Sequence, residues 1–420
     1  MSKAAQVDPI VTDAWAEHGD AMLVCTTSRL LATPREGESD SFVLHAPLEL
    51  AARAGLLPWV WPEHKEAARG QILSLARRYR RWGPAAPAAV GLVPSFRTAR
   101  DGAGALAAAI DKGDLESVDV ITRGLASTAT PQAMCDALAP VVIQHLGAAA
   151  HAPIFLYLYP RVSPRGELSA ELLRPLLRQL ARDGDQTLHW VKYSNLRSSE
   201  PASTKAYWQA LVDIPNIGPH ESGLIYPTMA RVDVRGENIA APLLGQVCGG
   251  TDTHDRGRAL LRAAAWSMLL EPDTHAAYGW THALTMTQAA IGISAALSDP
   301  GLGLAVASTY LVGFRAARAT VPLPASAGAI YRPRGGARLV LKEALQDSRE
   351  AAAAAAYFEA VHDPEFVMSQ LAGQASALED AHLVKYVLAC FDAARDDRIH
   401  QALFLAAAAS LVAYWNARLS

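Results

Sequence analysis

The spacing of apolar residues along this chain predicts helices almost throughout. Leu383 with Val387, and Val384 with Leu388, stand four residues apart, so each pair lies on one face of a helix. Strands would instead show apolar and polar residues in alternation, and that pattern occurs only in short pieces such as residues 230–234. The pattern therefore predicts an all-α protein of about a dozen helices.

Prolines, glycines and polar clusters divide this pattern into separate elements. Helices are expected over residues 8–33, 41–55, 63–82, 100–110, 115–125, 130–139, 168–182, 187–196, 255–270, 280–296, 301–320, 337–362, 379–390 and 398–419. Pro47 restricts where the second helix can begin, so we expect His45 at its entrance. Residues 141–158 form a very apolar segment that ends at Pro160, and Pro175 is expected to kink the helix around it.

The least regular part of the chain is residues 197–250, which contain five prolines. Such a composition fits a lid or a connecting insert, and it does not distinguish between them. We therefore expect one large multi-helix domain over residues 1–420, interrupted by an irregular insert.

Composition removes several classes of function. The formal charge of −3 comes without a basic block of the kind that binds nucleic acid, so no nucleic-acid partner is expected. The cysteines are widely scattered and form no C-x-x-C pair, which argues against a zinc ribbon and a secreted disulfide scaffold. They are Cys25, Cys135, Cys248 and Cys390. No signal-like apolar N-terminus and no membrane-spanning run is evident, so a cytoplasmic protein is expected.

Four histidines lie in or beside apolar helical sequence: His45, His151, His282 and His382. Taken singly, a histidine in such a place is more often a hydrogen-bonded core residue than a metal ligand. Lys385 follows His382 by three residues, so the two side chains share one face of a helix, where an apolar environment disfavours the lysine charge. Our hypothesis is that these histidines together build a metal centre.

His145 competes with His151 for a place in such a centre. A separation of six positions corresponds to a net rotation of about 240° around a helix, so the two side chains cannot both face one point.

A carboxylate-bridged di-iron bundle is a rival interpretation, because the E-x-x-H spacing that it uses occurs twice. The two pairs are Glu359 with His362 and Glu379 with His382. His362 stands at a helix end before a proline, and no pair of inward-facing glutamates on apolar helices is evident, so solvated helix ends are the favoured interpretation. Walker, Rossmann, G-x-S-x-G and H-E-x-x-H motifs are absent from the sequence.

The histidine segments resemble, in order along nearly the whole chain, motifs of the questin oxidase-like family, helical proteins known from fungal aromatic polyketide pathways. The similar segments are 44–48 (an H-x-P element), 147–154 (small residues, then histidine), 188–193 (an aromatic segment), 281–285 (H-A-V-T) and 380–390 (H-x-I-K, ending in A-C). Leu284 and Val384 replace the usual valine and isoleucine, and residues 197–250 match poorly.

This resemblance implies a non-haem iron site held by four histidines and a lysine carboxylated on its side-chain nitrogen. The matching residues are His45, His151, His282, His382 and Lys385. Neutral imidazoles suit Fe(II) but supply no negative charge, which a carbamate on the lysine would add. An apolar environment helps to keep the lysine amine neutral, and only the neutral amine can react with carbon dioxide.

The resemblance therefore predicts an iron-dependent oxygenase that cleaves a polycyclic aromatic or quinone-like substrate with dioxygen. Tyr157, Tyr278 and Trp280 neighbour predicted ligands and are candidates to line the substrate pocket, although aromatic core packing is the commoner role. One alternative is a metal-free, NADPH-dependent Baeyer–Villiger-type oxidase. Another is a non-catalytic helical protein that binds a hydrophobic metabolite. Homo-oligomerisation is left open.

Overall fold

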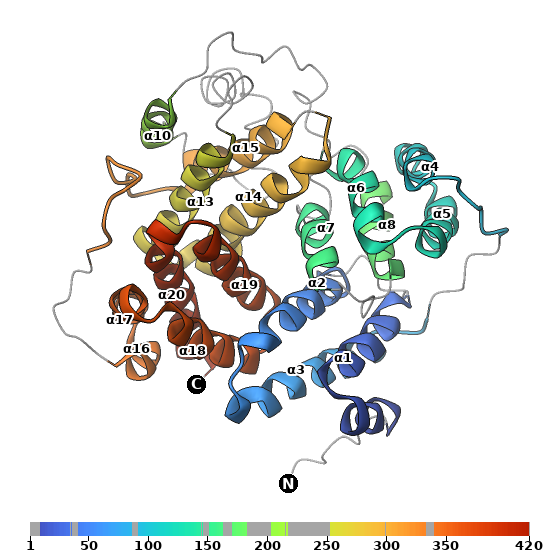
Figure 1. The fold of residues 1–420 in the computed structure, drawn as a ribbon, viewed down its shortest axis with the longest axis horizontal. Coiled ribbons are helices and arrows are strands. Elements are labelled where there is room, and N and C mark those ends of the chain that lie inside the picture. Colours follow the sequence, from blue (N-terminus) through green and yellow to red (C-terminus); the bar gives the residue numbers. More distant parts are fainter. Residues whose placement is uncertain are drawn as a thin grey trace.

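The computed structural model describes residues 9–33, 35, 41–85, 91–143, 145, 151–162, 170–182, 203–214, 216, 253–298, 300–332 and 340–419 of the 420-residue chain. In these ranges the protein is built from helices and their connections, and no sheet is present. The predicted all-α class is thus confirmed (Figure 1).

The first half of the chain supplies nine described α-helices and two short 3₁₀ helices. They are α1 (Pro9–Ala32), α2 (Ser41–Leu56), η1 (Leu57–Trp59), α3 (Pro62–Arg80), α4 (Ala99–Asp111), α5 (Leu115–Thr128), α6 (Pro131–Val142), α7 (His151–Val162), η3 (Ala170–Leu173), α8 (Arg174–Arg182) and α10 (Thr204–Val212).

The second half contains eight described α-helices. They are α13 (Thr253–Leu270), α14 (Thr281–Ile293), α15 (Pro300–Arg318), α16 (Leu341–Asp347), α17 (Arg349–His362), α18 (Pro364–Ala377), α19 (Ala381–Asp396) and α20 (Gln401–Leu419). Shorter helical turns are η4 (Asp273–His275), η5 (Ala276–Trp280), η6 (Ser294–Ala296) and η7 (Arg398–His400).

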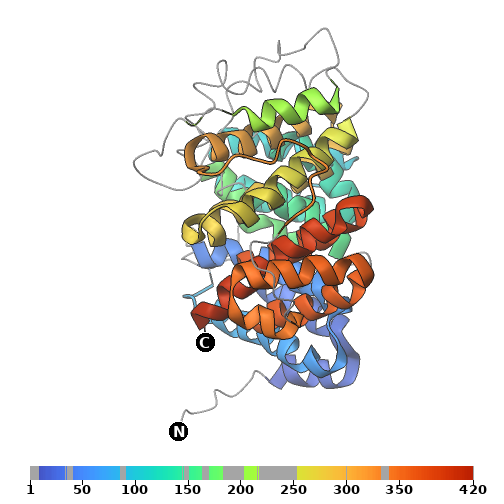
Figure 2. The ribbon, with the colours of Figure 1, turned by 90° about the vertical axis from the view of Figure 1, so that its left-hand side faces the viewer.

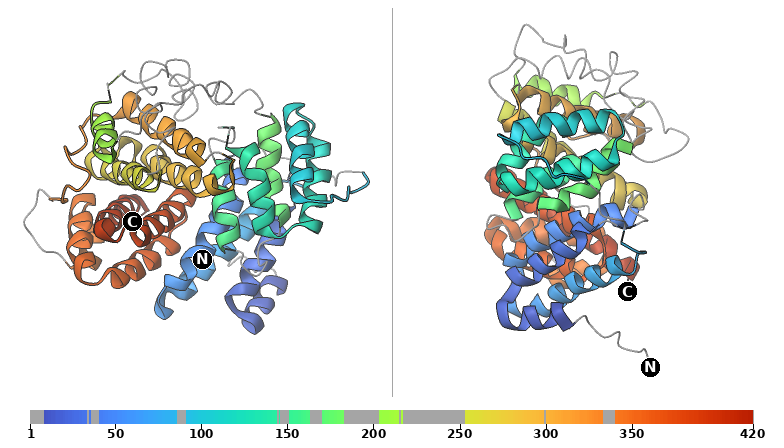
Figure 3. Two further views of the ribbon diagram at one scale, coloured as in Figure 1. Left: turned by 45° about the horizontal axis from the view of Figure 1, so that its top comes forward. Right: turned by 90° about the vertical axis from the view of Figure 1, so that its right-hand side faces the viewer.

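Four helices from distant parts of the sequence form the centre of the molecule. α2 packs on α7, α7 on α14, α14 on α19, and α19 on α2, so the four make a closed ring of neighbours. α4 and α5 lie at one end of the molecule, and α16 and α17 lie at the other (Figures 1 and 3). α16 and α17, drawn in orange, face the viewer in Figure 2. The ring therefore lies between these two pairs of helices.

α19 is buried along most of its length. Every residue from 381 to 391 is buried, so the helix has no solvent-facing stripe over its first three turns. α2 and α14 cover it within the ring, and α18 and α20 cover it from outside. Its polar residues His382 and Lys385 are consequently held in the interior.

The structure corrects the predicted position of His45. α2 begins at Ser41, with Pro47 inside the helix, so His45 lies about one turn beyond the helix start and not at its entrance. Proline has no backbone N–H, so Pro47 leaves only the carbonyl four residues earlier without its helical hydrogen bond. One missing bond near a helix start is tolerated because the rest of α2 is packed in the core.

Two other predicted elements are divided in the structure. The helix expected over residues 337–362 is two helices, because the Ser348 side chain accepts a hydrogen bond from the Ala351 amide and thereby begins α17. The apolar segment 141–158 is split as well, since α6 ends at Val142 and α7 begins at His151. The kink expected at Pro175 corresponds to the change from η3 to α8 one residue earlier.

Two features of the sequence analysis fall mostly outside the described residues. The helix expected over residues 187–196, which includes the aromatic segment 188–193, lies wholly outside them. The predicted insert 197–250 is described only at residues 203–214 and 216, where α10 begins with Ser203 as its N-cap. Among the helices that the structure describes, none has the length and apolarity needed to span a bilayer.

Candidate metal centre

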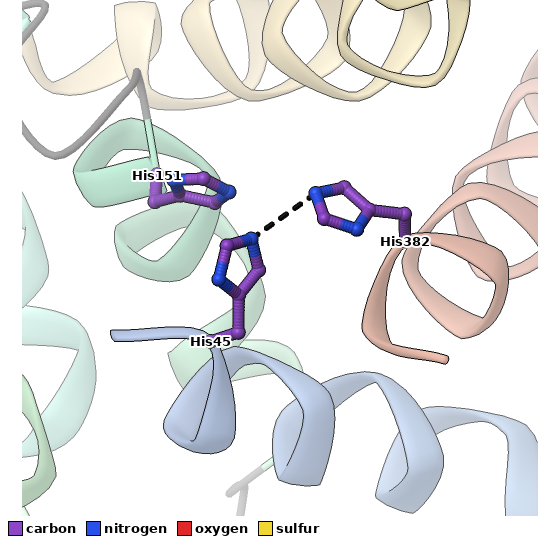
Figure 4. Close-up of side chains that lie close together, drawn as sticks. All are labelled: His45, His151 and His382. Carbon is purple, nitrogen blue, oxygen red and sulfur yellow. Dashed lines mark hydrogen bonds between the residues drawn. The ribbon is translucent and has the colours of Figure 1, made fainter. Parts of the chain in front are cut away.

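The central ring brings four imidazoles together. The Nε2 atoms of His45 on α2 and His382 on α19 are 3.1 Å apart, and so are those of His151 on α7 and His282 on α14. The ring centres of His45 and His151 are 4.2 Å apart, so the two pairs adjoin. Figure 4 shows three of these rings pointing toward one another from three different helices. All four histidines singled out in the sequence therefore lie in one cluster.

Burial keeps three of these imidazoles uncharged. Removal from water lowers the pKa of His151, His282 and His382 well below the ordinary value of 6.5, and the nearby positive charge of Lys385 lowers it further. A neutral imidazole has one nitrogen that carries a proton and one with a free lone pair. At neutral pH each of these three rings can thus offer a lone pair to a cation.

The tautomer of His282 follows from its neighbour. Its Nδ1 lies 2.6 Å from the backbone carbonyl oxygen of Tyr278, and because a carbonyl can only accept, Nδ1 must donate. The Nε2 atom of His282 therefore presents its lone pair toward His151. Histidines that bind metals usually donate the other ring N–H to such an acceptor.

The spacing of the imidazoles fits a shared metal ion. Two nitrogen ligands about 2.1 Å from a metal, at right angles to each other, lie about 3.0 Å apart. Both Nε2 pairs in the cluster are separated by 3.1 Å. One nitrogen from each of His45, His151 and His382 lies within 4.8 Å of the other two. The donor set and its spacing thus suit a transition metal that accepts nitrogen ligands.

Lys385 adds an uncommon amine to this cluster. Its side chain is fully buried, and its Nζ atom has no hydrogen-bond partner among the described residues. Burial lowers the pKa of this amine from 10.5 to about 7, although the negative charges of Asp380 and Glu49 oppose the shift. About half of the amine is consequently uncharged at neutral pH, when it can act as a nucleophile.

A π-helical turn, η5, leads directly into the helix that carries His282. π-helical turns are rare and occur often at functional sites. This turn supplies the Tyr278 carbonyl to His282, and it places the Tyr278 ring edge-on to His382, with ring centres 4.9 Å apart. Tyr278 is also 47% exposed, so it connects the buried cluster with the surface.

Gly279 lets this turn lie against the core, and its replacement is expected to have a measurable cost. A Cβ atom at Gly279 would lie 2.1 Å from the buried ring of Phe314. We expect Gly279→Ala to lower the free energy of unfolding by about 1–3 kcal/mol, as overpacking does. Gly104→Ala is the matched control, because a Cβ there meets nothing within 4 Å. Equal urea midpoints for the two variants would contradict this interpretation.

The other two aromatic candidates pack elsewhere. Trp280 is 1% exposed and lies against Phe314, with ring centres 4.8 Å apart, in the core-packing role weighed above. Tyr157 packs on Gly292, where an added Cβ would come within 2.1 Å of the ring. It also lines a cavity of about 160 Å³ between α6, α7 and the end of α14. Tyr157 follows His151 by six residues and so points from another face of α7.

Three of the four residues of the rival di-iron centre do not face the interior. Glu359 and His362 are exposed on α17. Glu379 is about half exposed and pairs with Arg78 at 3.0 Å. A carboxylate-bridged centre needs inward-facing glutamates, and these two E-x-x-H pairs do not supply them. His145 is buried, but the group of possible metal ligands identified among the described residues contains His151 instead.

Three charged residues beside the cluster were not singled out in the sequence. Glu49 and Arg53 follow His45 at four and eight residues, on the same face of α2, and both are buried. Asp380 caps α19, and its Oδ2 atom lies 4.0 Å from Nδ1 of His382. A glutamate and an arginine four residues apart in an otherwise apolar helix are the signal that could have identified the first two.

Comparisons with protein-family models, with curated proteins and with solved structures each found no match to this chain.

Proposed function

We propose that this protein is a non-haem iron oxygenase that uses dioxygen to cleave a polycyclic aromatic or quinone-like substrate. The observation that carries the proposal is the convergence of four imidazoles, three of them buried, in pairs with Nε2 atoms 3.1 Å apart, beside an amine that has no hydrogen-bond partner among the described residues. A histidine that serves only to stabilise the fold usually hydrogen-bonds to a backbone or carboxylate group, whereas these imidazoles face one another.

His45, His151, His282 and His382 would hold the iron through their Nε2 atoms, and Lys385 would bind it as a carbamate. Bound Fe(II) would supply the one-electron chemistry that dioxygen needs in order to react with an organic substrate. The residues of the chain do the rest: they keep the imidazoles neutral, orient their lone pairs and exclude water from the cluster.

Carboxylation of Lys385 answers a charge problem in this site. Four neutral imidazoles leave a divalent cation uncompensated, while an ammonium group would repel it. Attack of the neutral amine on carbon dioxide forms an N–C bond and releases one proton, which leaves an anionic oxygen group in place of a cation. Glu49 forms ion pairs with Arg53 and Arg78, which offset part of its negative charge. The attraction between Glu49 and a charged Lys385 is therefore weakened.

The surface beside Tyr278 supports an aromatic substrate. Its half-exposed ring lies edge-on to His382 and also to Trp415, with ring centres 4.9 and 6.5 Å apart respectively. Aromatic edges and faces of this kind pack well on a planar ring. We therefore assign Tyr278 the role of contacting the substrate near the metal.

The test is metal analysis and oxygen uptake on protein purified without air. We expect about one iron per chain, and dioxygen consumption in the presence of a hydroxylated polycyclic quinone that stops when a chelator removes the iron. Undiminished, NADPH-dependent oxygen uptake by iron-free protein would instead favour the metal-free oxidase. Ligand binding without any oxygen uptake would favour the metabolite-binding protein.

A further inference from the structure

The end of α18 is held by side chains from two other helices. Nη1 and Nη2 of Arg53 donate to the carbonyl oxygens of Ser376 and Leu378, at 3.0 and 2.8 Å. Between them, Nε2 of Gln71 donates to the carbonyl oxygen of Ala377 at 2.9 Å. The last carbonyls of a helix have no partner within it, and here three consecutive ones are satisfied from α2 and α3. A positive side chain is also favourable at that end of the helix dipole.

Arg53 is itself held rigidly. It is 1% exposed, and its Nε atom donates to Oε1 of Glu49 at 2.8 Å. Arg78 approaches the same Glu49 oxygen at 3.5 Å and also pairs with Glu379 at 3.0 Å. The guanidinium therefore has a fixed orientation, and its donors are directed at the turn between α18 and α19.

This turn leads directly into α19, the helix that carries His382 and Lys385. Two residues after Leu378, the Asp380 side chain accepts a hydrogen bond from the Leu383 amide and so begins α19. His382 is the second residue of α19 and Lys385 the fifth. The start of α19 thus has little freedom, because the turn before it is bound to α2.

One face of α2 both contributes an imidazole to the histidine cluster and holds the turn before α19. His45, Glu49 and Arg53 are spaced by four residues and therefore lie one above another along the helix. One end of this stripe contributes an imidazole to the cluster, and the other end holds the turn that precedes His382. Any shift of α19 along α2 would break the bonds of Arg53 and separate His45 from His382, whose Nε2 atoms are 3.1 Å apart.

We propose that Arg53 is a positioning residue for the metal centre: it fixes the start of α19 so that His382 and Lys385 meet His45. The inference rests on the metal centre of the proposed function and not on its oxygen chemistry. Arg53 touches neither metal nor substrate, so its positioning effect acts through the backbone carbonyls of Ser376 and Leu378, and its pairing with Glu49 is a separate, electrostatic contact.

The experiment compares Arg53→Met with Arg315→Met in the full-length, metal-free protein, using Co(II) without air as the probe. Arg315 is a matched control, because it is buried on α15 and donates to Ser267 Oγ at 2.7 Å and to the Val321 carbonyl at 2.9 Å. We expect Arg53→Met to weaken Co(II) binding about 10- to 100-fold, as is typical when a residue that orients a metal ligand is lost. Arg315→Met should leave the affinity within about twofold of the wild type while lowering the melting temperature.

A second measurement does not depend on metal. Amide hydrogen exchange over residues 381–387, measured relative to exchange in the buried helix α20, should speed up in Arg53→Met and keep the wild-type ratio in Arg315→Met, since only the first loosens the start of α19 locally. Arg53→Lys, which keeps the charge beside Glu49 but cannot reach both carbonyls, should fall between the wild type and Arg53→Met.

Unchanged Co(II) affinity and unchanged exchange in Arg53→Met would overturn the proposal, and so would equal losses in both methionine variants. Wild-type protein that binds Co(II) but consumes no dioxygen would refute the oxygenase and leave the role of Arg53 standing. Wild-type protein that binds no metal would refute the metal centre and, with it, this inference as stated.

Discussion

Replacing His382 by alanine is expected to weaken metal binding by at least about 100-fold. This is more than the loss that is typical when a residue that only orients a metal ligand is removed. His382 stands between two parts of the cluster: its Nε2 atom faces that of His45, and its ring centre is 5.1 Å from that of His282. Without this ring the metal loses one of its nitrogen ligands, and the remaining imidazoles hold it more weakly. Titration with Fe(II) or Co(II) in the absence of air measures the effect.

The matched control for this variant is His362→Ala. Both histidines follow a glutamate by three residues, but His362 is exposed on α17 and His382 is buried on α19. We expect His362→Ala to bind metal as the wild type does. Equal losses in the two variants would revive the di-iron interpretation, and no loss in His382→Ala would refute the metal centre.

Thermal unfolding gives an independent measure of the same variant. A metal that binds only the folded state raises the melting temperature as its concentration rises. Iron should therefore stabilise the wild type and His362→Ala but not His382→Ala. Without metal, His382→Ala should melt close to the wild type, because the imidazole that it removes is a buried polar group facing another imidazole.

The helices could be predicted from the sequence because their signals are local. The four-residue spacing around Leu383 and Val387 indicated α19, and the Thr130–Pro131 pair marked the start of α6. Local signals failed where a single side chain decided the outcome. Ser348 divides an alanine-rich segment that periodicity alone reads as one helix, and η5 departs from the regular helical repeat without any apolar signal.

The site could be predicted only in part. Periodicity left each histidine as a core residue, and the five-residue set came from the resemblance of short motifs to a family. Which distant helices adjoin depends on packing between residues such as His45 and His382, which are 337 positions apart. The bonds from Arg53 to residues 376 and 378 are equally non-local, so no sequence pattern near Arg53 announces them.

Replacing Lys385 by methionine is expected to stabilise the metal-free protein and to remove its function. The wild-type amine is fully buried without a hydrogen-bond partner among the described residues, whereas methionine fills similar space without a charge. Apolar replacement of a buried charge often raises stability, and we expect a gain of about 1–3 kcal/mol in the free energy of unfolding at pH 7. Urea unfolding of both metal-free proteins measures it.

The pH dependence of this gain has a definite sign. Burial lowers the pKa of Lys385 from 10.5 to about 7 in the folded protein, so the unfolded chain binds more protons between these values. The stability of the wild type therefore rises relative to the variant as pH increases from 7 to about 10.5. A difference that stays constant over this range would show that Lys385 keeps an ordinary pKa.

Carbon dioxide separates a carboxylated lysine from a merely buried one. If Lys385 carries a carbamate, removing bicarbonate from the buffer should weaken metal binding by the wild type, and returning it should restore the affinity. Lys385→Met should bind metal weakly at every bicarbonate concentration, because it has no amine to carboxylate. ¹³C-labelled bicarbonate should give a carbamate NMR signal in the wild type alone. Wild-type affinity that ignores bicarbonate, together with no such signal, would exclude the carbamate while leaving the four imidazoles as the metal ligands.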